Sequence, residues 1–173
     1  GLAVVWGTVQ DHKGYVTVKS RLDEGSCFSL YFPAVRQGQT GPAVSLPLDD
    51  LLGQKQKVLI VDDVQEQRHI GAQILTRLNY QPATVSSGET ALVYLKENMC
   101  DLVLLDMIME PGIDGLETYK GIIKIDPEIK VIITSGFSES NKVKTAQQLG
   151  AGRYIKKPYS LEDIGLAIKE ALE

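Results

Sequence analysis

The feature that most constrains the fold of this chain is a regular alternation of short apolar segments with amphipathic segments, from residue 56 to the end. The apolar segments are residues 57–61, 82–86, 101–106, 130–135 and 153–157. Between them, apolar residues recur at spacings of three and four, which places them on one face of a helix. Five repeats of this alternation predict a parallel, doubly wound α/β sheet with right-handed crossovers.

For two of the expected helices, the spacing of apolar residues is regular enough to predict where the helix begins and ends. We expect the third helix at about 115–125 and the fourth at 138–149. The strand segments 57–61, 101–106 and 130–135 are apolar almost throughout, as expected of strands that helices cover on both faces.

The first 35 residues have a different pattern. The segment LAVVWGTVQDHKG predicts a helix with Leu2, Val5 and Val9 on one side and Gly14 as its C-terminal stop. YVTVKSRL and CFSLYF then alternate around DEGS, which predicts a β-hairpin. Residues 36–55 are rich in Gly, Pro and Gln and read as a linker, in which LPLDDLL could form a short helical turn.

Polar residues gather where the predicted strands end. In open α/β sheets, ligands bind beyond the carboxyl ends of the strands. The residues that the sequence places there are Asp62, Asp63, Asp106, Thr134, Ser135, Lys156 and Lys157. Each of them alone has an ordinary explanation, such as an Asp that caps the next helix. Their joint occurrence at equivalent strand ends favours a site.

The adjacent carboxylates of Asp62 and Asp63 indicate what such a site would bind. Clustered carboxylates repel one another, so without a cation we expect at least one of them to titrate above its ordinary pKa near 4. Mg²⁺ prefers oxygen ligands and often keeps a phosphate oxygen in its shell. A cation beside Asp106 would leave a carboxylate oxygen as nucleophile toward a phosphoryl group, and Ser135 and Lys157 could hold its other oxygens.

At these residues the chain resembles a known family. KVLIVDD, LVLLDMIMEPGIDG, VIITSG and YIKKP are similar to the receiver domains of two-component response regulators. The resemblance covers residues 56–173 and implies a flavodoxin-like, five-stranded parallel sheet of order 2-1-3-4-5. It also implies Mg²⁺ as cofactor and a histidine kinase or a histidine phosphotransfer protein as partner.

The resemblance also assigns roles residue by residue. Asp106 would be the phosphoacceptor, with Mg²⁺ held by Asp62, Asp63, Asp106 and the backbone carbonyl of Ile108. Lys157 would bind the phosphate, followed by a cis bond to Pro158. The switch residues would be Ser135, with the small residue Gly136 beside it, and Tyr154, whose alternative explanation is a half-buried edge aromatic.

The chain departs from the family in the loop after the acceptor. Nine positions separate Asp106 from Gly115 where the family usually has eight, and Glu110 is the apparent extra residue. We therefore expect this loop to bulge and to bring a further acid near the site. Ile108 is apolar where a polar residue is frequent. Neither change removes a required group, but both leave the phosphoryl lifetime open.

Residues 1–35 carry a second resemblance. GLAVVWGTVQDHKGYVTVKS and GSCFSLYFP are similar to the end of a histidine-kinase ATP-binding domain. The implied parent is a hybrid sensor histidine kinase of which this chain, beginning with Gly-Leu-Ala, would be a fragment. The asparagine box, earlier glycine boxes and lid of such a domain are missing. His12 and His69 lack the acidic neighbour of a phosphoacceptor histidine and read as ordinary surface histidines.

The residues at the strand ends are compatible with more than one function. The leading hypothesis is a phosphorelay receiver that switches conformation and catalyses only its own phosphorylation and dephosphorylation, which leaves open whether it counts as an enzyme. The alternatives are a Mg²⁺-dependent phosphohydrolase with an aspartyl nucleophile and an inactive, receiver-like interaction module. A phosphohydrolase would usually carry its two aspartates two residues apart and a substrate cap. A nucleotide-binding module would need a glycine-rich loop, which VDDVQEQ lacks.

Composition limits the partners. The net charge is −4 with charges of both signs well mixed, which argues against a nucleic-acid surface. No apolar run approaches the roughly 20 residues of a membrane span, so we expect a cytoplasmic fragment without direct membrane contact, even if the parent kinase is anchored. The exposed apolar residues expected of 1–35 would pack on the receiver or on a second copy in a homodimer, or stay disordered.

Overall fold

The computed structural model of the chain describes residues 2–34, 47–136 and 141–173. The chain divides into two compact units, Gly1–Val44 and Ser45–Glu173, and each is described by itself. None of the helices in the described ranges combines the length and the apolarity that a membrane crossing requires.

The second unit is built on a five-stranded parallel sheet. Its strands are β3 (Lys57–Val61), β4 (Gln81–Val85), β5 (Leu102–Asp106), β6 (Lys130–Ser135) and β7 (Tyr154–Lys156). They are arranged in the order β4-β3-β5-β6-β7. Numbered within this unit, the order is 2-1-3-4-5, so the predicted doubly wound topology is confirmed.

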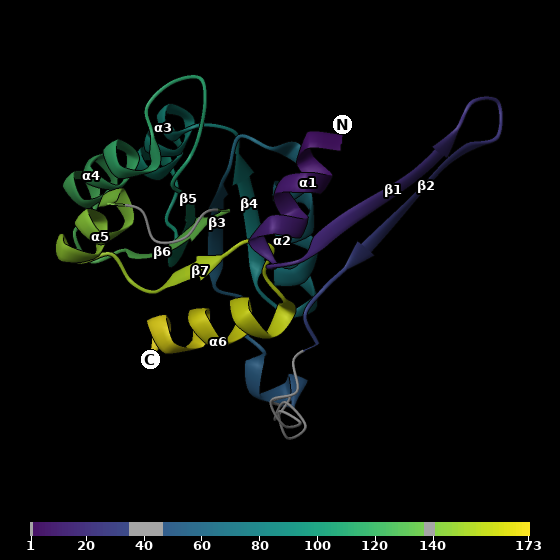
Figure 1. The fold of residues 1–173 in the computed structure, drawn as a ribbon. Helices are drawn as coiled ribbons and strands as arrows, with labels where there is room; N and C mark the ends of the chain where they lie inside the picture. Colours follow the sequence, from purple (N-terminus) through teal and green to yellow (C-terminus); the bar gives the residue numbers. More distant parts are fainter. Residues whose placement is uncertain (1, 35–46, 137–140) are drawn as a thin grey trace. The chain divides into compact units, whose positions relative to one another are not determined.

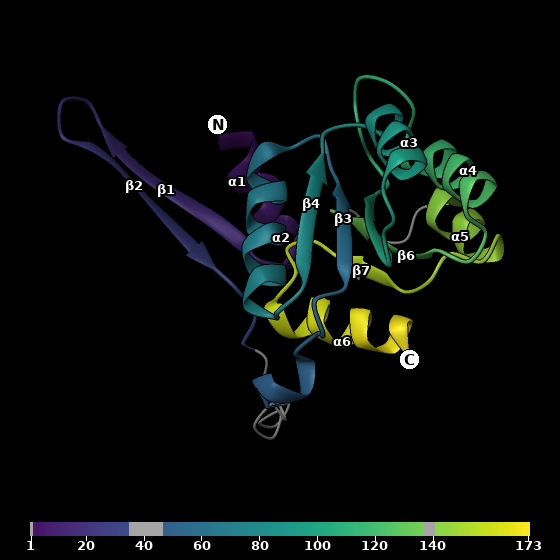
Figure 2. The same cartoon turned by 180° about the vertical axis from the view of Figure 1, so that it is seen from behind.

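Five helices cover this sheet on both faces. They are α2 (Gln65–Arg77), α3 (Gly88–Glu97), α4 (Gly115–Ile125), α5 (Asn141–Gln148) and α6 (Leu161–Leu172). Figures 1 and 2 show α2 and α6 against one face and α3, α4 and α5 against the other. The predicted bounds of α4 are confirmed, and the expected start of the fourth helix at 138–140 lies outside the described residues.

The sheet separates two apolar cores. Along β3, Val58 and Ile60 pack into the core under α2 and α6, whereas Leu59 and Val61 pack into the core under α3, α4 and α5. The same alternation continues along β5 and β6. Because successive side chains of a strand point to opposite faces, continuously apolar strands fill both cores at once.

Part of the expected linker belongs to the second unit. A single 3-10 turn, η1 (Leu48–Leu51), forms within LPLDDLL as expected. Leu51 is only 1% exposed and packs in the α2/α6 core. Gly53 donates its N–H to the Leu78 carbonyl at 2.8 Å, and Asn79 Nδ2 donates to the Gly53 carbonyl at 2.7 Å. Leu51 and Gly53 therefore pack within the second compact unit.

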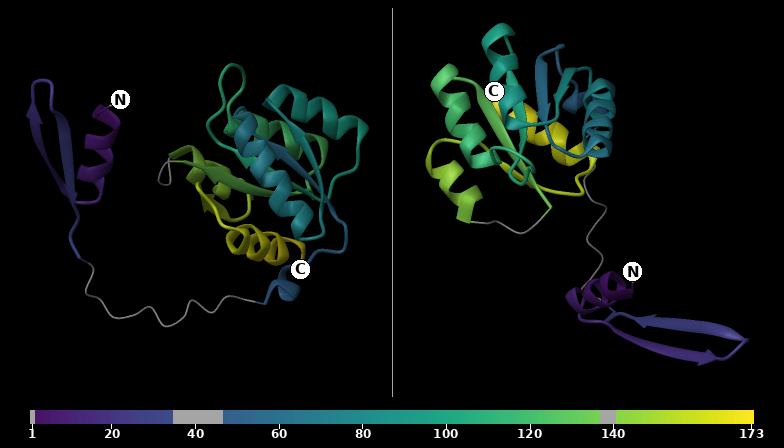
Figure 3. Two further views of the ribbon diagram at one scale, coloured as in Figure 1. Left: turned by 90° about the vertical axis from the view of Figure 1, so that its right-hand side faces the viewer. Right: turned by 90° about the horizontal axis from the view of Figure 1, so that it is seen from above.

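Residues 2–34 of the first unit form one helix and one hairpin, as predicted (Figure 3). Helix α1 (Leu2–Asp11) is followed by β1 (Tyr15–Arg21) and β2 (Gly25–Tyr31), which pair antiparallel. The expected role of Gly14 was wrong in detail. Lys13 adopts the left-handed conformation that ends the helix, with φ 54°. Gly14 is needed for close approach, because a Cβ there would lie 2.5 Å from the Tyr31 carbonyl oxygen.

Candidate functional site

The topology brings two of the three aspartates to one edge of the sheet. β3 and β5 are neighbours in which Ile60 pairs with Leu104. Asp62 and Asp106 lie two residues further along their strands, so both are on the same face. Both are buried, with residue exposures of 2% and 6%. The carboxyl end of the central strands thus holds two desolvated acids side by side.

Lys157 lies between these two acids. It follows β7, where its backbone N–H donates to the Ser135 carbonyl at 2.8 Å. Its Nζ donates to Asp62 Oδ2 at 2.5 Å and to Asp106 Oδ2 at 2.9 Å. The Lys157 side chain is 11% exposed. The predicted Lys157–Pro158 cis bond is confirmed.

Burial and charge act against each other in this cluster. Burial is the largest effect on Asp106 and raises its pKa. The hydrogen bond and charge of Lys157 lower this pKa, whereas the charge of Asp62 raises it, and the net shift is upward. Burial alone would lower the pKa of Lys157, but hydrogen bonds to Asp62 and Asp106 raise it overall. One acid therefore titrates high, as expected, although burial contributes more than repulsion. Lys157 supplies the nearest compensating charge.

Asp63 completes an acidic cluster. Oxygen atoms of Asp62, Asp63 and Asp106 all lie within 4.8 Å of one another. Ligand atoms of an octahedral Mg²⁺ are at most about 4 Å apart, so these oxygens lie close to the spacing that one ion requires. Three hard oxygen donors in this arrangement match the preferences of Mg²⁺.

The other predicted site residues lie at or near the same edge. Ser135 ends β6 and is 3% exposed. Ile108 donates its N–H to Asp106 Oδ1 at 3.3 Å, while the residue is 46% exposed. Gly136 follows Ser135, and a Cβ on it would meet nothing within 4 Å. Tyr154 begins β7 and is half-buried against the α3/α4/α5 core, outside the acidic cluster.

The longer loop approaches the site with its backbone. Glu110 donates its N–H to Asp63 Oδ2 at 3.4 Å, and its side chain is exposed. The extra residue therefore adds an amide contact to the cluster, and its peptide bond to Pro111 is cis.

Sequence reasoning missed two residues that contact this site or its loop. Arg68 reaches back from α2, where its Nη1 donates to the carbonyls of Asp62 at 2.7 Å and Asp63 at 2.9 Å. Glu89 at the start of α3 accepts the N–H of Ile113 at 2.8 Å. Arg68 could have been found from the sequence, because it is a cation in the helix that directly follows the acid pair. No local signal reveals the second, because the contact joins residues 24 positions apart.

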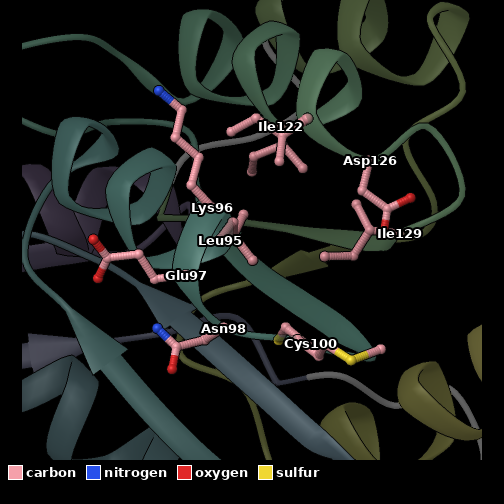
Figure 4. A pocket seen from close by; sticks show the side chains of 10 residues that line it. Leu95, Lys96, Glu97, Asn98, Cys100, Ile122, Asp126 and Ile129 are labelled. Carbon is pink, nitrogen blue, oxygen red and sulfur yellow. The ribbon is translucent and has the colours of Figure 1, made fainter.

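A cavity of about 490 Å³ lies next to the residues that precede β5 and β6, away from the acidic cluster (Figure 4). Residues 95–100, the end of α4 and Ile129 line it. The charged ends of Lys96 and Glu97 extend away from Leu95 in this view. Cys100 donates its thiol to the carbonyls of Lys57 and Leu102, and burial raises the pKa of that thiol. This cavity lacks the converging charges of the acidic cluster.

The fold and the acidic edge together define a receiver-type signalling domain. The family model described as "Response regulator receiver domain" matches residues 58–169. The chain belongs to this family. Receiver domains of this family bind Mg²⁺ at an acidic pocket, which in this chain corresponds to the cluster of Asp62, Asp63 and Asp106.

Similar proteins come from signalling systems. The chain is 35% identical over 117 residues to "Sporulation initiation phosphotransferase F" of Bacillus subtilis, covering 68% of this chain and 94% of that protein. It is 27% identical to "Sensor kinase CckA" of Brucella abortus along 100% of this chain but only 19% of the kinase. A CheY-like receiver structure from Methanospirillum hungatei gives a TM-score of 0.64 at 27% identity, covering 68% of this chain and 93% of that one. The homology is consistent with phosphoryl acceptance in a phosphorelay.

Proposed function

We propose that Asp106 accepts a phosphoryl group from a phosphohistidine and that this step switches the domain between two conformations. The observation that carries the proposal is the placement of the Asp106 carboxylate within the acidic cluster and beside Lys157, whose ammonium lies 2.9 Å from Asp106 Oδ2. A carboxylate held beside one fixed cation and a site for a second is suited to approach a negatively charged phosphoryl group.

In the transfer, an oxygen of Asp106 attacks phosphorus while the phosphorus–nitrogen bond to the donor imidazole breaks. The electron pair of that bond stays on the imidazole nitrogen, and the product is an acyl phosphate on Asp106. Mg²⁺, when bound, would neutralise charge on the phosphoryl oxygens and would be held by Asp62, Asp63, Asp106 and the Ile108 carbonyl.

Lys157 has two tasks in this scheme. Before transfer it compensates Asp62 and Asp106, whose carboxylates it bridges. After transfer it pairs with a phosphoryl oxygen. Ser135 ends the neighbouring strand β6. Its hydroxyl would move toward a phosphoryl oxygen, and Tyr154 would change rotamer in response. The half-buried position of Tyr154 is compatible with such a change.

The acceptor role is tested with a small acyl phosphate as donor. The full chain with Mg²⁺ should gain one phosphoryl mass that hydroxylamine removes. The adduct should be absent with EDTA and in Asp106→Asn, and it should form much more slowly in Lys157→Ala. An adduct that persists in Asp106→Asn would refute the proposal, as would equal formation without metal.

The alternatives predict other outcomes of the same assay. A phosphohydrolase would release phosphate from small phosphomonoesters with multiple turnovers, whereas a receiver uses only activated donors. An inactive interaction module would form no adduct although its acids are in place.

We also propose that the parent is a hybrid sensor histidine kinase located in the cytoplasm or anchored at the membrane. The alignment with the sensor kinase runs along the whole chain, including residues 1–44, and supports this context. The domain assignment of 1–35 as the end of an ATP-binding domain, with a linker before the receiver, belongs to this proposal. Phosphotransfer from a purified histidine kinase or histidine phosphotransfer protein would identify the physiological donor, and sedimentation would test the homodimer.

A further inference from the structure

The loop between β5 and α4 is attached to the acidic cluster at one end. It starts directly after Asp106 and continues to Asp114, which caps α4 by accepting the Glu117 N–H at 2.9 Å. Near its start, Ile108 donates its N–H to Asp106 and Glu110 donates its N–H to Asp63. The backbone of this loop therefore contacts two of the three acids.

The other end of the loop is held by a residue outside the cluster. Glu89 Oε1 accepts the Ile113 N–H at 2.8 Å, next to the cap of α4. Hydrogen bonds with the Ile113 amide, its own amide and the Ser87 side chain hold the pKa of Glu89 below its usual value. A carboxylate acceptor makes a stronger hydrogen bond than a neutral one.

The loop is shaped around this carboxylate. Gly112 has φ +120°, a conformation that L side chains rarely adopt. A Cβ at this position would lie 2.5 Å from Glu89 Oε1. The glycine thus satisfies a backbone requirement and leaves space for the carboxylate of α3 to reach Ile113.

We propose that Glu89 is a positioning residue for the metal and phosphoryl site, which it influences by fixing the loop that touches Asp63 and Asp106. The inference rests on the proposed Mg²⁺-dependent function. Holding Ile113 restricts the segment between it and Asp106, and this segment includes Ile108, whose carbonyl is the proposed fourth ligand. Without the Glu89 contact, the loop has more conformations, and binding of the ion must restrict them.

The chain offers a matched control for a general effect of charge at a helix start. Glu162 is the second residue of α6 after the N-cap Ser160, as Glu89 is the second residue of α3 after the N-cap Ser87. Both helices have capping boxes, and both glutamates are exposed. Only Glu89 is hydrogen-bonded to Ile113 of the loop. Any effect through the helix dipole alone should be equal for the two.

The test compares Glu89→Ala, Glu89→Gln and Glu162→Ala in the full chain by NMR. Amide exchange at Ile113 reports the anchor, and titration with MgCl₂ reports the site. In Glu89→Ala we expect exchange at Ile113 to be faster by about tenfold or more. The Mg²⁺ dissociation constant should rise by about threefold to tenfold. This is less than the loss of about tenfold to a hundredfold expected when a residue that hydrogen-bonds a metal ligand directly is removed, because Glu89 acts through the loop. Glu89→Gln retains the acceptor oxygen without its charge and should restore both in large part, whereas Glu162→Ala should change neither.

Two results would overturn the inference. One is unchanged Mg²⁺ affinity in Glu89→Ala despite faster exchange at Ile113, which would show an anchor without influence on the site. The other is an equal loss of affinity in Glu89→Ala and Glu162→Ala. Failure of the wild-type chain to form the Asp106 adduct, with these Mg²⁺ results intact, would refute the acceptor role and leave the positioning role standing.

Discussion

The two units of this chain bury their apolar residues to different extents. In the second unit, Leu51 from a four-residue turn is 1% exposed. In the first unit, Trp6 of α1 and Phe28 of β2 are 55% and 46% exposed. The second unit has helices on both faces of a sheet, whereas the described residues of the first, 2–34, form one helix and two strands. Burial therefore follows from the number of layers that can enclose a side chain, and not from its apolarity alone.

The first unit shows what local interactions can specify without such layers. Its hairpin register pairs Tyr15 with Tyr31, whose rings stack with centroids 4.6 Å apart. Further along, the hydroxyls of Ser20 and Ser26 are hydrogen-bonded at 2.7 Å. Cross-strand pairs of this kind contribute less than about 1 kcal/mol each. They define which residues pair, but they do not give the unit a stable core.

The largest contrast should appear when the units are separated. A peptide of residues 1–34 should show no cooperative thermal unfolding, because a lone helix and hairpin bury too little apolar surface. Residues 45–173 should unfold cooperatively with the same midpoint as the full chain, followed by circular dichroism. Cooperative melting of the peptide would contradict the comparison.

Single truncations should sharpen the contrast. Leu51→Ala should lower the free energy of unfolding of the second unit by about 2–4 kcal/mol, because it leaves a cavity beside Gly165 and Leu78. Trp6→Ala should leave that free energy within about 0.5 kcal/mol. Urea denaturation measures both. Comparable losses would show that the first unit contributes to the same cooperative core.

A smaller effect on stability should come from the carboxylates clustered in the second unit, which have no counterpart described in the first. Asp63→Asn removes one acid from the cluster while keeping an acceptor for Glu110. Without metal it should stabilise the protein by about 1 kcal/mol, because repulsion falls. With MgCl₂ the order should reverse, since the wild type gains binding energy that the variant loses. Thermal shifts with and without Mg²⁺ test this, and undiminished Mg²⁺ affinity in the variant would exclude Asp63 from the site.

The smallest effects should come from ion pairs. Burial raises the pKa of Asp114, but hydrogen bonds from Lys142 and Glu117 and the Lys142 charge outweigh it and lower the pKa overall. A carboxyl with a lowered folded pKa adds stability above its unfolded pKa and loses it as pH falls through the folded value. Asp114→Asn, which can still cap α4, should melt below wild type at pH 7.

The control for this pH effect lies in the hairpin. The difference between Asp114→Asn and wild type should close as pH falls below the ordinary value of 3.8. Glu24→Gln breaks the Arg21–Glu24 pair, whose side chains are 80% and 64% exposed, and should leave the melting temperature unchanged at either pH. A pH-independent gap in Asp114→Asn would show that the loss is one of capping and not of charge.

Much of the second unit could be predicted because several sequence signals agree. Spacing gave the bounds of α4, and buried strands gave a parallel sheet whose carboxyl ends face one way. The convergence of Asp62, Asp106 and Lys157 follows from that geometry. It does not require knowledge of any long-range contact beyond the strand order.

The rest could not be predicted because it depends on contacts between distant segments. Leu51 resembles any residue of a Pro- and Gly-rich linker, and only its fit against Gly165 and Leu78 makes it core. Gly14 was expected to end a helix by its backbone freedom, yet its role depends on the Tyr31 carbonyl of a later strand. Composition and periodicity carry no information about such fits.

The division of the second unit into two cores has a consequence for how such a domain diversifies. Val58, Ile60, Leu102 and Leu104 fill one core, and Leu59, Val61, Val103 and Leu105 fill the other. Substitutions that share no partners add independently in free energy. Substitutions in the α2/α6 core can therefore accumulate with little effect on packing in the α3/α4/α5 core. The sheet between the two cores would keep its acidic edge throughout.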